Sequence, residues 1–154
     1  MKIGIGADHR GVILKTKIIK FLQGLGHNIT DYGTASETAV DYPKIGFRLA
    51  RDVAGKELRF GILMCYTGQG MAMTANKVPG VRAAICTTPK VAELTRAHND
   101  ANILVLPAGF IGFDNQTRAI IKAFLNTKFQ GGRHLRRIKM IKKYERDHIV
   151  RDGL

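Results

Sequence analysis

The sequence predicts an α/β fold in which a doubly wound sheet of five parallel strands is flanked by helices. Short apolar runs alternate with longer segments of helical apolar spacing, an order typical of a parallel sheet. Glycine, proline and polar clusters separate these segments, and no internal repeat or low-complexity linker divides the chain. With 154 residues and 45% hydrophobic content, residues 1–154 are expected to form one domain with a real core.

The first strand is expected at residues 2–7. The helix that follows carries an apolar stripe with spacings of four, four and three residues. Its members are Leu14, Ile18, Leu22 and Leu25. Gly24 and Gly26 end this helix, and residues 27–32 form the second strand.

The middle of the chain repeats this pattern. Residues 45–53 have helical apolar spacing, and Pro43 suits the start of that helix. The third strand, residues 60–64, is a short apolar run of the kind that forms a buried parallel strand. It leads into the loop at residues 65–70, and residues 71–77 continue as helix.

The last third adds two strands and three helices. Strands are expected at residues 81–86 and 101–106, and the helix between them starts near Thr88 and runs to about Ala97. Another helix is marked by Ile111, Ala119, Ile120, Ala123 and Phe124. The chain closes with a basic C-terminal helix.

Charge is concentrated in that last helix. The formal net charge is +13, and the segment 128–146 holds eight Lys or Arg against one acid, Glu145. Leu135, Ile138 and Ile141 fall on one arc, so the helix can dock by one side. Its charge is either a solvated face, an RNA-binding stripe or a wall of an anionic substrate site.

The chain contains no apolar run long enough for a signal peptide or a membrane span, which predicts a cytoplasmic protein without a membrane partner. Cys65 and Cys86 are the only cysteines. Without a secretion signal, they are expected to be free thiols, with Cys86 in the core.

The loop Cys65-Tyr66-Thr67-Gly68-Gln69-Gly70 is the strongest candidate site. A strand that ends in glycines at the start of a helix turns several backbone N–H groups toward one small volume, which favours an anion. A thiol at its mouth ionises more easily than a free cysteine and can act as base or nucleophile. The alternative is a buried apolar cysteine followed by a glycine turn.

Polar residues also follow other strands of the predicted sheet. In doubly wound folds, ligands bind outside the carboxyl ends of the strands. Asp8-His9 follows the first strand, the Cys65 loop follows the third, and His98-Asn99-Asp100 precedes the fifth. We expect these three clusters to converge on one edge.

Five blocks occur in order along almost the whole chain. They are Asp8-His9, Asp41-Tyr42-Pro43, Cys65-x-Thr67-Gly68-x-Gly70 with Ala75-Asn76-Lys77, His98-Asn99-Asp100-x-Asn102, and Gly131-Gly132-Arg133-His134-x-x-Arg137. Together they resemble the type B ribose-5-phosphate isomerases, a family that includes the galactose-6-phosphate isomerase subunits. The resemblance implies a Rossmann-like fold and an aldose–ketose isomerase with no metal or other cofactor. It also implies a homodimer or homotetramer whose subunits share active sites.

The resemblance assigns Cys65 as the base that carries a proton across an enediolate, assisted by Thr67. The N–H groups of Tyr66 to Gly70, including Gly68 and Gly70, would stabilise the enediolate. A thiolate suits this work because a general base is most efficient when its pKa lies near the operating pH.

His98 matches the family's ring-opening histidine, and Asn99 matches its neighbour in the site. Alternatively, His98 only caps a helix end. Asp8 orients the sugar hydroxyls or the opening ring, caps the first helix, or does both. Tyr42 either contacts the substrate or only packs.

His9, His134 and Arg137 match the family's phosphate-binding positions. On a helix, His134 lies three residues and Arg133 four residues from Arg137, so the three are neighbours. The planar arginine fork suits phosphate because it donates two bonds at once.

Two positions depart from the family pattern. Position 66, commonly glycine, is Tyr66 here, which adds bulk beside the base and narrows or redirects the sugar pocket. Many members carry a phosphate-binding arginine where this chain has Gly109. Either Arg10 or Arg96 compensates, or the substrate differs from ribose 5-phosphate.

The predicted activity is the interconversion of ribose 5-phosphate and ribulose 5-phosphate. An isomerase of another sugar or sugar phosphate, six-carbon sugars included, is the alternative. A basic nucleic-acid-binding module is disfavoured, because aromatic content is only 7% and no stacking platform is evident. A thiol redox role lacks a second cysteine near Cys65.

Overall fold

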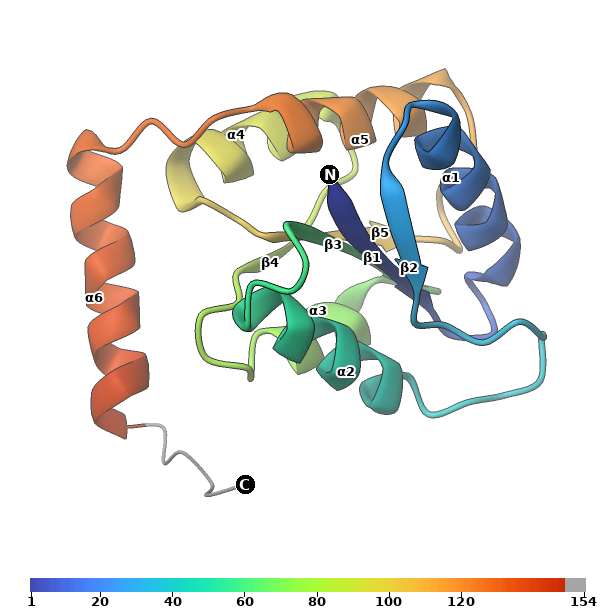
Figure 1. Cartoon of the computed structure of the whole chain (residues 1–154), viewed down its shortest axis with the longest axis horizontal. Coiled ribbons are helices and arrows are strands. Elements are labelled where there is room, and N and C mark those ends of the chain that lie inside the picture. The colour runs from blue at the N-terminus through green and yellow to red at the C-terminus, as the bar shows by residue number, and fades with distance from the viewer. Residues whose placement is uncertain (149–154) are drawn as a thin grey trace.

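A computed structural model describes residues 1–148 and places one parallel sheet between two layers of helices (Figure 1). The strands are β1 (Lys2–Ala7), β2 (Asn28–Asp31), β3 (Phe60–Cys65), β4 (Ala83–Ile85) and β5 (Ile103–Pro107). The helices are α1 (Val12–Gly24), α2 (Tyr42–Ala54), α3 (Gln69–Ala75), α4 (Pro89–Asn99), α5 (Asn115–Asn126) and α6 (Gly132–His148). The predicted domain, 1–154, extends past the described residues at 149–154.

The sheet has the strand order β2-β1-β3-β5-β4, and every neighbouring pair is parallel. Its central strand is β3, in which Ile62 lies level with Ile5 of β1 and Leu104 of β5. All six residues of β3 are buried. This confirms the predicted doubly wound α/β sheet of five parallel strands.

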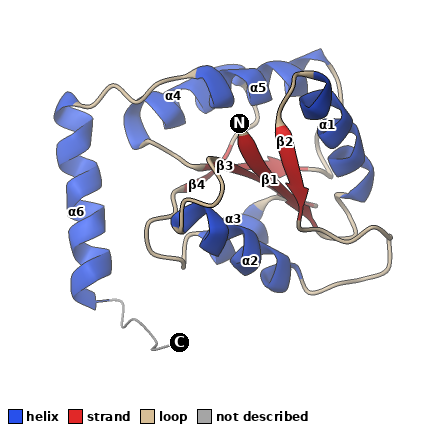
Figure 2. Ribbon diagram, viewed as in Figure 1, coloured by secondary structure: helices blue, strands red, loops and turns tan. Residues whose placement is uncertain are grey.

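Helices cover both faces of the sheet, as Figure 2 shows around the red strands. On one face, α1 and α5 pack through side chains that include Ile18, Leu22 and Phe124. On the other, α2 buries Ile45, Leu49 and Val53, which recur every four residues and form one stripe. The Cys65 side chain belongs to this second face.

Two sequence expectations fail at helix ends. Leu25 was expected on the buried stripe of α1, but it is 50% exposed because the helix ends at Gly24. Ile111 was expected inside the fifth helix. It lies in the preceding loop, because the Asp114 carboxylate accepts a bond from the Thr117 N–H and starts α5 there.

The basic helix α6 stands at one side of the molecule, next to the end of α4 (Figure 1). It contacts the body at Ile138, and Glu145 accepts a bond of 3.0 Å from the Gly80 N–H. The predicted docking arc is only partly correct, since Leu135 and Ile141 remain exposed with Met140 and Tyr144. The helix therefore keeps an exposed apolar surface.

Within residues 1–148, no helix combines the length and the apolar character that crossing a membrane requires.

Candidate active site

The loop after β3 holds a thiol beside free backbone donors. Cys65 ends the strand and is 6% exposed. Gly68 then adopts φ 78°, a left-handed conformation that favours glycine, and α3 begins at the next residue. Gln69 N–H donates to the Thr67 hydroxyl oxygen at 3.3 Å.

The other N–H groups of this loop remain available. Within residues 1–148, the backbone N–H groups of Tyr66, Thr67, Gly68 and Gly70 donate to no protein acceptor. The first N–H groups of any helix lack an intrahelical partner, and here they lie directly after a buried thiol. The arrangement suits an anion formed next to the sulfur.

Asp8 and His9 lie at the same edge of the sheet. The Asp8 N–H donates to the Met64 carbonyl, one residue before Cys65, at 3.3 Å. Its buried carboxylate accepts a bond of 2.9 Å from the Arg10 N–H, so it starts the turn before α1. The Val40 N–H donates to Nδ1 of His9 at 3.4 Å, which leaves Nε2 for a ligand.

Tyr42 reaches the loop from the first turn of α2. A Cβ atom on Gly70 would lie 2.6 Å from Cζ of Tyr42, so the ring rests directly on this glycine. The structure therefore brings Tyr42 to the Cys65 loop, and the absent side chain at Gly70 makes room for it.

Tyr66 forms an aromatic wall on the outer side of the loop. Its ring is 52% exposed and packs against Phe110 with centroids 5.6 Å apart. A Cβ atom on Gly109 would lie 2.4 Å from two ring carbons of Tyr66, and the Arg10 guanidinium stands 6.0 Å from the ring centroid. The two departures from the family pattern, Tyr66 and Gly109, are thus one packing unit. Sequence reasoning missed Phe110, although it follows β5 and so had to lie at this edge.

His98 and Asn99 lie at the opposite edge of the sheet. Helix α4 leaves the carboxyl end of β4 and runs back, so its last residues precede β5. The Asn102 carbonyl accepts a bond from Gly61 N–H, at the start of β3, whereas Cys65 ends that strand. A strand of this length spans about 16 Å. The prediction that the Asp8, Cys65 and His98 clusters converge on one edge of the sheet is therefore wrong for a single chain.

The residues around His98 form a second polar group. The rings of His98 and His134 stack with centroids 4.2 Å apart and an interplanar angle of 6°. Arg133 and Arg137, on the same helix as His134, are exposed. Burial lowers the pKa of His134, and the charges of His98, Arg133 and Arg137 lower it further. The guanidinium groups of Arg133 and Arg137 therefore lie beside the stacked imidazoles, and such a group of donors suits a phosphate.

Cys86 and Arg96 have structural roles. Burial raises the pKa of the Cys86 thiol to about 12, in keeping with the predicted core position. The Arg96 guanidinium packs over the rings of Phe60 and Phe124 and pairs with Asp100, so of the two arginines considered as replacements only Arg10 lies near Tyr66. Among the described residues, no three His, Cys, Asp or Glu side chains are grouped to hold a metal ion.

Known proteins are similar to this chain in both sequence and fold. The profile of a family described as Ribose/Galactose Isomerase matches residues 3–141. Ribose-5-phosphate isomerase B of Escherichia coli (strain K12) is 40% identical over 144 residues, which cover 94% of this chain and 96% of that protein.

Two solved structures extend the comparison. Ribose-5-phosphate isomerase B of Clostridium thermocellum matches with a TM-score of 0.93 and 44% identity, covering 96% of this chain and 99% of that one. The Mycoplasma genitalium ribose-5-phosphate isomerase B with bound ribulose-5-phosphate matches with a TM-score of 0.89 and 40% identity, covering 95% and 97%.

A doubly wound sheet with a thiol and unpaired amide donors at its carboxyl edge is the architecture of an α/β enzyme. The chain belongs to the ribose/galactose isomerase family, and it is an isomerase. The resemblance noted from its five sequence blocks is confirmed.

Proposed function

We propose that residues 1–154 act as a single isomerase domain that interconverts ribose 5-phosphate and ribulose 5-phosphate through an enediolate. The observation that carries this proposal is the buried Cys65 thiol next to the unpaired N–H groups of Tyr66, Thr67, Gly68 and Gly70. The relative with bound ribulose-5-phosphate supports the choice of sugar phosphate. The mechanism uses no metal and no other cofactor.

Cys65 is the base of the proposed reaction. Its thiolate takes the proton from C2 of the open-chain aldose, the C–H electron pair forms the C1=C2 bond, and O1 gains the negative charge. The thiol then returns the proton to C1, while the hydroxyl proton of O2 passes to O1 and C2 becomes the carbonyl. Burial of the sulfur limits exchange of this proton with water.

The loop donors and Thr67 complete this half of the site. The N–H groups of Tyr66, Gly68 and Gly70 stabilise the enediolate oxygens, and one well-aimed donor of this kind contributes about a hundredfold or more in rate. Because the Thr67 oxygen already accepts from Gln69, its O–H is free to move a proton between O1 and O2. Asp8 and Tyr42 hold the sugar hydroxyls at this edge.

A second copy of the chain supplies the other half. His98, which opens the sugar ring, and Asn99 lie at the far edge of the sheet from Cys65, so one chain alone does not complete the constellation. A two-fold axis places each copy's His98 group against the partner's Cys65 loop and forms two equal sites. The exposed apolar residues of α6, Met140 and Tyr144, favour such an assembly, a homodimer or a homotetramer built from it.

Phosphate is held between the two copies. His9 reaches it with Nε2 from the Cys65 side, while Arg133, His134 and Arg137 reach it from α6 of the other chain. Two guanidinium forks and two imidazoles suit a phosphate monoester dianion. Two free cysteines fit a reducing compartment, so we propose the cytoplasm as the location of the protein.

Tyr66 leaves the choice of sugar open to test. Many family members carry an arginine where this chain has Gly109. Here the rings of Tyr66 and Phe110 form an aromatic wall at that position instead. Another sugar or sugar phosphate, six-carbon sugars included, is therefore the alternative substrate. Comparing kcat/KM for five- and six-carbon aldose phosphates separates the two.

The base is tested with purified protein in the presence of EDTA. We expect turnover of ribose 5-phosphate, and a loss of at least about a hundredfold in kcat for Cys65→Ala. Cys86→Ala removes the other thiol, which is buried in the core, and is the matched control that keeps its activity. Equal activity in Cys65→Ala and the wild type would remove Cys65 from the role of base.

A further inference from the structure

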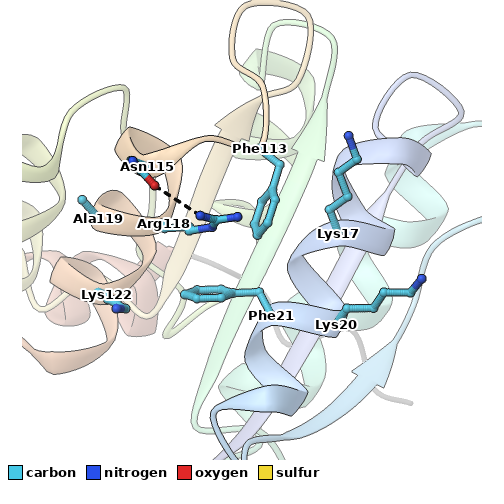
Figure 3. Close-up of a pocket in the computed structure, with 8 residues that line it drawn as sticks. All are labelled: Lys17, Lys20, Phe21, Phe113, Asn115, Arg118, Ala119 and Lys122. Carbon is cyan, nitrogen blue, oxygen red and sulfur yellow. Dashed lines mark hydrogen bonds between the residues drawn. The ribbon is translucent and has the colours of Figure 1, made fainter.

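A cationic groove lies between α1 and α5, on the helical face of the molecule rather than at the carboxyl edge of the sheet (Figure 3). Its volume is about 730 Å³, within the range of about 300–1,000 Å³ typical of small-molecule sites. The residues that line it are Lys17, Lys20, Phe21, Phe113, Asn115, Arg118, Ala119 and Lys122. Neither the Cys65 loop nor the His98 group contributes to it.

Four cationic side chains line this groove, and Figure 3 shows that the ammonium groups of Lys17 and Lys20 extend outward from the two phenyl rings. Lys17 and Lys20 come from α1, and Arg118 and Lys122 come from α5. All four are exposed, and within residues 1–148 none forms an ion pair. No carboxylate lines the groove. Because these like charges repel one another across the groove, an anion with several charges is stabilised here.

Two aromatic rings form the floor. Phe21 and Phe113 pack edge to face with centroids 5.8 Å apart, and both are partly exposed. The Arg118 guanidinium lies 4.7 Å from the Phe113 centroid, where its contact with the Asn115 side chain helps to fix it. Lys122 lies 5.8 Å from the centroid of Phe21. A planar ligand can stack on this surface of rings and guanidinium.

We propose that this groove binds a nucleotide, with the base on Phe21, Phe113 and Arg118 and the phosphates on the lysines. A ligand that is both planar and polyanionic can stack on the phenyl rings and pair with the cationic side chains. Inorganic phosphate can only pair with the cations. A second copy of this chain does not fit, since a symmetric contact through this face would bring four further cations against the first four. The site is separate from the proposed isomerase site.

The proposal is tested by calorimetric titration of the full-length protein with ATP. The double variant Lys20→Gln/Lys122→Gln is expected to weaken ATP binding about tenfold, which two solvent-exposed ion contacts provide. Arg136→Gln/Lys139→Gln removes the same net charge from exposed positions of α6 and is expected to leave the affinity unchanged. Phe113→Leu, which keeps apolar volume but removes the ring, is also expected to cost about tenfold.

Ligand controls define the class of ligand. Adenosine alone and inorganic triphosphate alone should each bind at least tenfold more weakly than ATP. The proposal is overturned by no binding at millimolar ATP, by equal losses in the two charge variants, or by triphosphate binding as tightly as ATP. Tighter binding of a single-stranded oligonucleotide than of ATP would overturn the choice of a free nucleotide. Loss of ATP binding in Arg137→Gln, with none in Lys20→Gln/Lys122→Gln, would place ATP at the sugar-phosphate site instead.

Discussion

The substitution Gly109→Ala is expected to destabilise the aromatic wall at the Cys65 loop. The new Cβ would lie 2.4 Å from two ring carbons of Tyr66 and 2.8 Å from Cζ, so the ring has to move. The ring then loses its tilted contact with Phe110 and its contact with the Arg10 guanidinium. An aromatic pair and an exposed cation–π contact are each worth about 0.5–1.5 kcal/mol. Because Tyr66 is 52% exposed and can swing into solvent, the loss is limited to about 1–2 kcal/mol.

A double-mutant cycle measures this coupling. For a chain of this size, 1 kcal/mol lowers Tm by about 2–4 °C, so Gly109→Ala should lower Tm by about 2–8 °C. In the Tyr66→Ala background the same substitution should cost almost nothing, because the ring that blocks it is absent. Gly112→Ala is the matched control, since nothing lies within 4 Å of its added Cβ. If Gly109→Ala lowered Tm equally in both backgrounds, Tyr66 and Gly109 would not be coupled by packing.

Two further predictions concern stability. Because the pKa of His134 is lowered in the folded protein, the unfolded chain binds a proton first, and stability falls as the pH drops below about 6.5. Thermal unfolding of His134→Gln between pH 8 and 5 should show a smaller fall than the wild type, and an unchanged slope would contradict this origin. Arg96→Met removes a buried guanidinium that packs on Phe60 and Phe124 and pairs with Asp100. It should lower the free energy of unfolding by about 2 kcal/mol, measured with denaturant, and a change below about 0.5 kcal/mol would contradict the structural role.

Most of the fold was predictable from the sequence, because its elements have strong local patterns. The central strand is a continuous apolar run, and α2 repeats its apolar residues every four positions. Leu25 and Ile111 were misplaced because helix ends depend on single residues rather than on periodicity, here Gly26, which has a φ of 79° after α1, and the N-cap Asp114 of α5. The strand order β2-β1-β3-β5-β4 has no local pattern, since it depends on how crossovers pack.

The site was predictable only in part. Residues at the end of a strand or directly after it, such as Cys65 and Asp8, lie at the carboxyl edge as expected. His98 follows a helix, and a helix that returns across the sheet ends at the opposite edge, so its position was misjudged. The direction of α4 was the signal that could have corrected this. The contact of Tyr66 with Gly109 joins two loops far apart in the sequence, and only the folded chain reveals it.

The central claim is that Cys65 of one copy and His98 of another form one active site. It is tested most directly by mixing Cys65→Ala with His98→Gln, each inactive alone, and measuring isomerase activity after the chains exchange. In a mixed dimer one of the two sites carries both wild-type residues, so random mixing should restore about one quarter of the wild-type activity. If mixed assemblies form and remain inactive, or if His98→Gln is fully active alone, the shared site is contradicted.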